Sequence, residues 1–503
     1  MPCPLRQRRT EHDMLDKGSK FFIRAMLGIY MLLLGLGVFL GTFGKLESPS
    51  YVLAFLLAAV LFFCFFRFRA RLSGVMAHIP IPSVYLTGLI LSLFCLLLNL
   101  AWVLVFQIEP TVDFQTFYDT ALAIARDQRV DMLYLGLFPH ILGYSTFLGL
   151  MIRLFGESPL LAPLLNVVLT TVSGLCIYIL CLRWVNFKAA AAAFFLWSIC
   201  PSKLMYNAMV MSEPLYTCLI LLFLVLLSLA LDGSSRWLRL FAAMPLGLAS
   251  GALLLAVNVT RPVALILFVA FFLWAFLLRG KKLREIKSWL VLAVFTVSMF
   301  TAWSRCEYHW NLWEYLHIFE ETSDVPAYNI YVGLNMDSLG SYSDEDMETL
   351  MNYRYQGTAL SAQEKMLEEV KTRLSSGEID FPRLFAAKLA KLIGNDEGGA
   401  FYAQAELSPL AFKLSSAGSN VYYYFLVMLS LFGAAVLFRR PVFSTVYMAP
   451  LYSIGLILAH LIVEVSGRYK YSLIPMLIIV AAFAFQNSGK LKFEGAKKPE
   501  SLK

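Results

Sequence analysis

The chain alternates long apolar runs with short polar segments over most of its length. Twelve apolar runs are close to the length that a helix needs to cross ~30 Å of hydrocarbon, and none shows the alternating pattern of a membrane barrel. They are Phe21–Gly41, Tyr51–Phe66, Val84–Phe106, Leu160–Leu182, Ala189–Pro201, Ser212–Leu231, Leu238–Val257, Pro262–Leu278, Trp289–Trp303, Val421–Phe438, Phe443–Ile462 and Tyr469–Phe485. The pattern predicts an all-α polytopic bundle of about twelve transmembrane helices, in which Ala189–Pro201 is unusually short.

Lysine and arginine set the expected orientation of these helices. Their clusters fall on one side of the bundle, at 6–9, 67–71, 183–188, 236–239, 279–287, 439–440 and 490–503. By the positive-inside rule this side and both termini are cytoplasmic. A further apolar segment, Leu133–Phe155, would reverse every later loop if it crossed the membrane. We therefore predict a re-entrant or interfacial element there, with a kinked span as the alternative.

A polar insertion, residues 305–420, differs from the rest of the chain in charge. It holds 18 acidic and 9 basic residues, whereas the remainder holds 16 acidic and 33 basic. Within it SAQEKMLEEVKTRLSSG has helical spacing, and NIYVGLNMDSLGSYSDED favours strand and turn. We predict a small mixed α/β extracytoplasmic domain on a basic membrane body.

Composition supports this organisation. Hydrophobic residues make up 59% of the chain and charged residues 15%, against roughly 25% charged in ordinary soluble domains. The net charge of +8 follows from positive-inside bias and does not indicate a nucleic-acid partner. The predicted segments are a cytoplasmic basic tail (1–20), two N-terminal spans (21–83), a membrane core (84–304) with a first outer loop (107–159), the extracytoplasmic domain (305–420), C-terminal spans (421–486) and a second cytoplasmic basic tail (487–503).

Polar side chains recur at span ends on the predicted outer side. They are Asp113, Asp119, Tyr134, His140, Lys203, Glu213, Arg261, Glu464 and Arg468. Charges held at the rim of a membrane bundle mark functional sites, so these residues could converge on a cavity open to the outer leaflet.

Structural roles remain open for several of these residues. Lys203 and Arg468 could snorkel to headgroups, and Glu213 could stabilise a helix N-terminus. His140 could be a satisfied polar residue at the re-entrant turn. Asp119 follows Asp113 by six positions, which puts the two carboxylates on different faces of one helix. They are therefore not expected to share a proton, and Asp119 is expected to be a structural neighbour.

Familiar signatures of soluble enzymes are missing from the sequence. It contains no P-loop, nucleotide-binding glycine fingerprint, HExxH or GxSxG motif. A nucleotide-activated donor is therefore disfavoured, and a lipid carrier is the alternative at hand. We expect no cofactor and no metal ligands, although the sequence does not exclude a divalent metal.

Several motifs, taken in order, resemble a known superfamily. They are TVDFQTFYDTALAIA after a span, the segment ending in RLFG, SEPLY at a span start, a TRP break, and EVSGRYKYSLIP. From about Val84 to Phe485 the chain resembles the GT-C integral-membrane glycosyltransferases, most closely bacterial members of the protein O-mannosyltransferase-like glycosyltransferase family 39. YVGLNMDSLGSYSDED is similar to the outer domain of Gram-positive members.

The resemblance implies transfer of a sugar from a polyprenyl-phosphate carrier to an acceptor hydroxyl, usually with inversion. Asp113 matches the first-loop catalytic carboxylate and would be the general base. Arg261 and Arg468 would hold the leaving phosphate, with weaker candidates in Lys203, His140 and Tyr134. Here Phe114 follows Asp113, unlike the adjacent acidic residues of eukaryotic mannosyltransferases, so their protein-acceptor specificity does not carry over.

Together these observations predict a multi-pass enzyme of the bacterial plasma membrane. Its partners would be a polyprenyl-phosphate-linked sugar, membrane lipids, and an acceptor that is an envelope polymer, lipid or protein. Glu213, Asp119 and Glu464 would support the site. Two other classes fit the pattern: a transporter or flippase of a lipid-linked envelope precursor, and a non-catalytic scaffold for envelope assembly.

Overall fold

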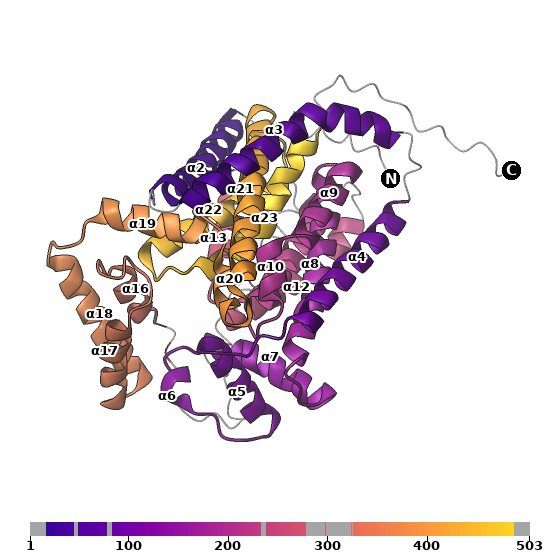
Figure 1. The fold of residues 1–503 in the computed structure, drawn as a ribbon. Coiled ribbons are helices and arrows are strands. Elements are labelled where there is room, and N and C mark those ends of the chain that lie inside the picture. The colour runs from indigo at the N-terminus through magenta and orange to yellow at the C-terminus, as the bar shows by residue number, and fades with distance from the viewer. Residues whose placement is uncertain are drawn as a thin grey trace.

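The computed structural model describes residues 17–44, 49–77, 83–232, 238–277, 297, 323 and 325–486. Within these ranges every regular element is a helix (Figure 1). Eight helical segments are long and apolar enough to cross a membrane. They are α2 (Lys17–Phe43), α3 (Pro49–Ala77), α4 (Val84–Val105), α8 (Leu161–Trp184), α11 (Glu213–Leu231), α21 (Pro409–Arg439), η3 with α22 (Thr445–Tyr447 and Met448–Ile462), and η4, α23 and η5 (Gly467–Lys470, Leu473–Ala481 and Ala482–Phe485). The chain is an α-helical multi-pass membrane protein, as its apolar pattern predicts.

Four of the twelve predicted spans do not appear as full-length crossing helices. Three are shorter apolar helices: α9 (Phe187–Ser198), the segment Pro245–Thr260 of α12 (Leu238–Thr260), and α13 (Ala264–Leu277). A helix of 12 residues such as α9 rises only about 18 Å, because each residue adds ~1.5 Å. The fourth, Trp289–Trp303, lies outside the described residues apart from position 297. The prediction of about twelve spans is thus met by eight in the described part of the chain.

The spans differ in how deeply they lie in the bundle. Gly467–Phe485 is 89% buried over its most apolar window, whereas α3 and α4 are 17% and 22% buried. Figure 1 shows α23 between neighbouring helices, with α3 and α4 at the margins. At Gly433 a Cβ would lie 2.0 Å from the Val480 carbonyl oxygen, so the absent side chain lets α21 and α23 approach closely. The C-terminal segment is therefore central, and α3 and α4 present apolar faces outward.

The segment after α4 folds into a small helical unit at one end of the bundle. It consists of α5 (Asp113–Ala125), α6 (Met132–Leu135) and α7 (His140–Phe155). The Ser145 hydroxyl donates to the Phe117 carbonyl oxygen at 3.0 Å near the start of the two helices, and Arg126 pairs with Glu157 just beyond their ends, so α5 and α7 pack in parallel. With 16 residues, α7 is shorter than the ~20 that a span needs. Its re-entrant or interfacial placement remains a prediction.

The inserted domain is helical throughout its described part, so the predicted mixed α/β fold is wrong there. It contains α16 (Ala327–Gly333), α17 (Asp344–Tyr355), α18 (Ala359–Ser375), α19 (Phe381–Ile393), α20 (Gly398–Tyr402) and η2 (Gln404–Glu406). The aromatic and β-branched residues of NIYVG suggested a strand, but Tyr328 and Val332 are both buried four positions apart, on one side of α16. Tertiary burial overrides strand propensity here. The helix α21 also begins at Pro409, earlier than the predicted span boundary at Val421.

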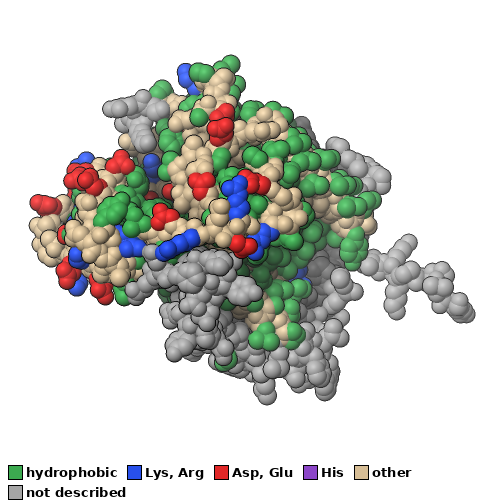
Figure 2. Space-filling view, turned by 90° about the horizontal axis from the view of Figure 1, so that it is seen from below, with side chains coloured by type: hydrophobic (Ala, Val, Ile, Leu, Met, Phe, Trp, Pro, Cys, Tyr) green, Lys and Arg blue, Asp and Glu red, His purple; other side chains and the backbone are tan. Residues whose placement is uncertain are grey.

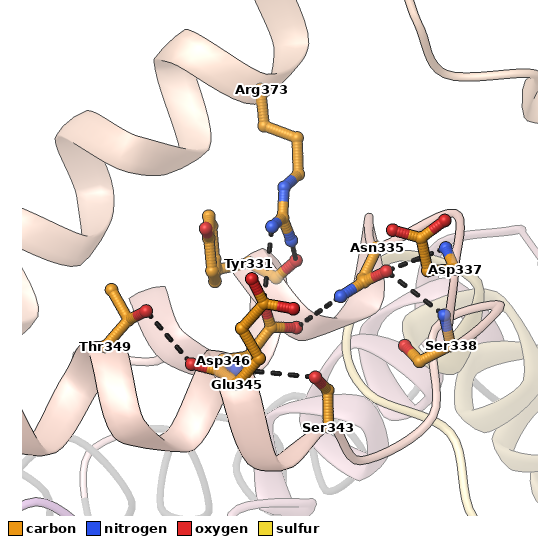
Figure 3. Close-up of polar contacts among 9 residues, drawn as sticks. All are labelled: Tyr331, Asn335, Asp337, Ser338, Ser343, Glu345, Asp346, Thr349 and Arg373. Carbon is orange, nitrogen blue, oxygen red and sulfur yellow. Dashed lines mark hydrogen bonds and ion pairs between the residues drawn. The ribbon is translucent and has the colours of Figure 1, made fainter.

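A polar network joins the first three helices of this domain (Figure 3). The Asn335 side-chain amide donates to Asp346 at 2.8 Å, and its oxygen accepts from the backbone of Asp337 and Ser338. Arg373 pairs with Asp346 at 3.3 Å and donates to the Tyr331 carbonyl oxygen at 2.7 Å. These bonds fix the turn between α16 and α17 against α18.

Both α16 and the turn that follows it are attached to the segment that precedes η4. Glu464 N–H donates to the Asn329 carbonyl oxygen at 2.8 Å, and Val465 N–H donates to that of Gly340 at 2.9 Å. The buried Lys388 ammonium donates to the carbonyl oxygens of Gly333 and Val463, at 2.8 Å each. The inserted domain therefore positions the chain just before Arg468.

Candidate functional site

Four charged side chains from distant parts of the sequence meet at the end of the bundle that carries α5. The Arg468 guanidinium Nη2 contacts the Asp113 carboxylate, and its Nε lies 3.9 Å from Glu213 Oε1. Arg261 Nη1 lies 3.6 Å from the same Glu213 oxygen. We call Asp113, Glu213, Arg261 and Arg468 the charged cluster. Figure 2 shows acidic and basic side chains gathered on the face seen from this end.

Each residue of the charged cluster lies at the end of a helix or in a short 3-10 helix between two longer ones. Asp113 and Glu213 are the first residues of α5 and α11, where the helix dipole favours a carboxylate. Arg261 directly follows the last residue of α12, and the next residue is a proline that cannot extend the helix. Arg468 lies in the short 3-10 helix η4. Helix ends thus bring two carboxylates and two guanidiniums to one level of the bundle.

The four side chains of the charged cluster differ in their exposure to solvent. The Glu213 side chain is 1% exposed, those of Arg468 and Arg261 are 11% and 13%, and that of Asp113 is 36%. Neither Glu213 oxygen nor Arg468 Nε has a hydrogen-bond partner among the described residues. Buried polar atoms without partners are uncommon, and they are found at sites that bind polar groups. Asp113 is the member that a molecule outside the bundle can reach.

Aromatic rings surround the two guanidiniums. The Arg468 guanidinium carbon lies 5.5, 5.8 and 5.6 Å from the ring centroids of Phe114, Tyr402 and Tyr469. The Arg261 guanidinium carbon lies 4.7 Å from the centroid of Tyr469. Cation–π contacts of this kind hold a guanidinium in place without occupying its N–H donors. The cations are therefore fixed in position while part of their donor capacity stays available.

Glu464, Tyr134 and His140 lie around this cluster. The Tyr469 hydroxyl donates to Glu464 at 3.2 Å, and burial raises the pKa of Glu464 against the opposing effect of Arg468. Burial, followed by the nearby Asp113 charge, raises the pKa of Tyr134 above its ordinary value. Burial also lowers the pKa of the partly buried His140 to about 3, and Arg261 adds to the effect. His140 is therefore a neutral imidazole at pH 7, able to donate a hydrogen bond but carrying no charge for a phosphate.

Lys203 and Asp119 lie apart from the charged cluster. Lys203 is buried in α10 (Pro201–Tyr206), where its ammonium lies 3.2 Å from both the Asn99 side-chain oxygen and the Ser198 carbonyl oxygen. The Asp119 carboxylate accepts a hydrogen bond from Gln115 at 2.6 Å. None of these contacts involves a residue of the charged cluster. The sequence had grouped Lys203 with Arg261 and Arg468 because all three lie at span ends.

A second buried ion pair involves another residue of η4. Lys470, two residues after Arg468, is 3.5 Å from Asp396, and both side chains are at most 2% exposed. Asp396 accepts a hydrogen bond from Ser202 in α10, its backbone N–H donates to the Asn420 side chain at 2.8 Å, and Lys470 donates to the Asn395 carbonyl oxygen. We call Lys470 and Asp396 the anchor pair, because it ties η4 to α10 and α21.

Sequence reasoning missed the aromatic and anchor residues. Tyr469 and Lys470 directly follow Arg468 in GRYKY, so the sequence does place them near the site. Nothing in the sequence pattern predicts which residues they contact. Tyr402 and Asp396 come from the inserted domain, and only the fold brings them to η4. No group of three or more His, Cys, Asp or Glu side chains that could hold a metal ion occurs in the described part of the chain.

Comparison with known proteins finds similarity among solved structures. No protein-family model matches the chain, and no curated protein sequence does. A solved structure of the archaeal oligosaccharyltransferase AglB from Archaeoglobus fulgidus, in complex with an inhibitory peptide and a dolichol-phosphate, aligns at 13% identity and a TM-score of 0.42. The alignment covers 79% of this chain and 50% of AglB, so the chain spans about half the length of that protein.

Proposed function

We propose that this chain is a GT-C-type glycosyltransferase that moves a sugar from a polyprenyl-phosphate carrier to an acceptor hydroxyl at the outer face of the membrane. The observation that carries the proposal is the charged cluster: a partly exposed carboxylate, Asp113, paired with Arg468 at the end of a membrane bundle, and a second guanidinium, Arg261, that shares Glu213 with Arg468. Its acceptor is a cell-envelope polymer, lipid or protein. The enzyme is placed in a bacterial plasma membrane with residues 305–420 outside.

The reaction exchanges one bond at the anomeric carbon for another. The acceptor oxygen forms a bond to that carbon as the bond to the phosphate oxygen breaks, and the acceptor's proton passes to Asp113. The products are the glycosylated acceptor and the polyprenyl phosphate. A carboxylate is suited to this role because it accepts the proton and also faces the positive charge that develops on the sugar.

The leaving phosphate gains negative charge as the bond breaks, and Arg261 and Arg468 would stabilise that charge. Guanidiniums offer paired N–H donors that match phosphate oxygens. Cations that are already in position stabilise developing negative charge most strongly where water is excluded. Their burial against Glu213 and aromatic rings supports preorganisation. The proposal includes no metal, so added chelator should leave the rate within about twofold, because the two arginines supply the charge.

The test uses purified protein in lipid nanodiscs with a panel of radiolabelled polyprenyl-phosphate sugars and a crude envelope acceptor fraction. The native chain should release polyprenyl phosphate and label the acceptor, and Asp113→Asn should slow both by about 10²–10⁴-fold. Asp119→Asn is the matched control, because it removes a carboxylate of the same helix that contacts Gln115 instead. Equal rates for the native chain and Asp113→Asn would remove Asp113 as the base.

The same assay separates an enzyme from a lipid transporter. A flippase would move the intact lipid-linked sugar between leaflets without releasing polyprenyl phosphate. Transbilayer movement of the labelled lipid in proteoliposomes, without cleavage of any donor in the panel, would replace the enzymatic proposal with transport.

A further inference from the structure

Arg468 contacts two carboxylates that differ sharply in accessibility. Its Nη2 contacts Asp113, whose side chain is 36% exposed, and its Nε faces Glu213, whose side chain is 1% exposed. Glu213 also faces Arg261 at 3.6 Å. A ligand arriving from outside the bundle can therefore compete with Asp113 for Arg468, but it cannot reach past the guanidiniums to replace Glu213.

Charge balance makes this competition necessary for an anionic ligand. The two guanidiniums of the charged cluster carry two positive charges, and Asp113 and Glu213 carry two negative charges when ionised. The cluster is then neutral as a whole, so no net positive charge is left for a phosphate. A phosphate can form a full ion pair with Arg468 only if the Asp113 carboxylate moves away from that guanidinium. A buried negative charge is stable only beside a positive charge that is not already neutralised.

The backbone before Asp113 is strained in the paired state. Val112 has φ 51° and ψ −121°, a conformation that a β-branched residue adopts only under constraint, and its side chain is 83% exposed. Strained residues of this kind cluster at sites that switch between two arrangements. Here the strained residue directly precedes the carboxylate that would have to move.

We propose that the Asp113–Arg468 ion pair is an interlock that the phosphate group of the lipid donor opens. The phosphate takes Arg468, and Asp113 is released to accept the proton of the acceptor hydroxyl. The donor therefore binds before the base is free, which prevents Asp113 from activating a hydroxyl, including water, at an empty site. This inference rests on the proposed function, because it assumes that the anion is a lipid phosphate.

Binding of undecaprenyl phosphate in nanodiscs tests the interlock without any sugar transfer. Asp113→Asn, which cannot pair as an anion with Arg468, should bind undecaprenyl phosphate about 10-fold more tightly than the native chain, a coupling of ordinary size. Asp119→Asn should change the affinity less than twofold. Asp113→Ala is a second variant without the carboxylate, and size-exclusion chromatography of each variant shows that it is folded. Undecaprenol and inorganic phosphate as competitors separate the contributions of tail and headgroup.

A double variant distinguishes competition for Arg468 from simple repulsion. Removing a negative charge favours any nearby anion through space, and that gain would persist in an Arg468→Gln background. The interlock predicts that Asp113→Asn/Arg468→Gln binds no more tightly than Arg468→Gln alone. A gain retained in the double variant, or no gain in Asp113→Asn and Asp113→Ala, overturns the interlock and leaves the proposed function standing. If neither the native chain nor Asp113→Asn binds the lipid phosphate, the proposed function fails, and the interlock fails with it.

Discussion

Arg468 and Lys470 lie two residues apart in η4, yet their ion pairs are opposite in character. Arg468 contacts Asp113, a partly exposed residue at the start of α5, whereas Lys470 pairs with Asp396, which is 1% exposed and bonded on other sides to α10 and α21. Burying both partners of an ion pair costs desolvation that their attraction barely offsets. A pair of that kind fixes geometry, and a pair with one exposed partner can exchange it. Accessibility of the carboxylate, more than distance, separates the two roles.

The largest expected effect comes from breaking the anchor pair. Asp396→Asn or Lys470→Met leaves a buried charge without its counter-charge and should lower the free energy of unfolding by about 3–5 kcal/mol. Asp113→Asn should lower it by less than about 1 kcal/mol, because its carboxylate is part exposed. Thermal unfolding in detergent, followed by tryptophan fluorescence and light scattering, measures the difference.

Removing both charges of the anchor pair provides the control. The double variant Asp396→Leu/Lys470→Met should be more stable than either single variant, because no unpaired charge remains. If Asp113→Asn proves as damaging as Asp396→Asn, the distinction between an exchangeable pair and an anchoring pair is wrong.

A smaller effect is expected for the second guanidinium of the charged cluster. Arg261→Gln should weaken binding of undecaprenyl phosphate by about 10- to 100-fold, equivalent to ~1.5–3 kcal/mol for hydrogen bonds to a charged group. Lys203→Gln is the matched control, since that lysine lies in a separate network with Asn99 and Ser198. Equal losses in the two variants would return Lys203 to the phosphate site.

The pH dependence of stability tests the neutral histidine beside the charged cluster. Because the folded pKa of His140 is about 3 and its ordinary value is 6.5, the unfolded chain binds the extra proton between these values. The stability contributed by neutral His140 is complete above pH 6.5 and is lost as pH falls, approaching about 1.4 kcal/mol per pH unit. In the His140→Asn variant the thermal unfolding midpoint should change less with pH between pH 6.5 and 5 than it does in the native chain. An unchanged slope in that variant would assign the dependence to other groups.

The smallest effect concerns the strained residue before Asp113. Val112→Gly should raise the free energy of unfolding by about 1 kcal/mol, because glycine adopts positive φ without the Cβ clash. Val105→Gly, at an exposed position in the last turn of α4, should have the opposite sign because glycine weakens helices. Destabilisation by both substitutions would show that the conformation of Val112 stores no strain.

The sequence was most informative about the membrane bundle and the members of the charged cluster. Apolar runs predict eight full-length helices correctly, since burial in lipid or in a membrane core demands a continuous apolar stretch. Charged residues at span ends identified Asp113, Glu213, Arg261 and Arg468, which the fold brings together. The same signal also selected Lys203, because position at a rim does not reveal which way a side chain turns.

Elements and contacts that depend on tertiary packing could not be predicted from the sequence. The helix α16 was expected to be a strand, because a run of only seven residues has too little periodicity to distinguish the two. Asp396 and Tyr402 had no local pattern that pointed to η4, more than sixty residues further along the chain. Such pairings are set by packing between distant segments, which one sequence does not display.

The backbone hydrogen bonds that Glu464 and Val465 donate to Asn329 and Gly340 determine how modular this protein is. Each bond uses a main-chain carbonyl of the inserted domain to satisfy a main-chain amide in the chain just before Arg468. A domain joined in this way cannot be deleted or exchanged like a cassette, because its removal would leave the amides of Glu464 and Val465 without their acceptors and the Val463 carbonyl oxygen without its donor, Lys388. A chimera designed to change acceptor preference has to keep α16 and the turn after it, which make these bonds. It can vary only the faces of α17 and α18 that point away from them.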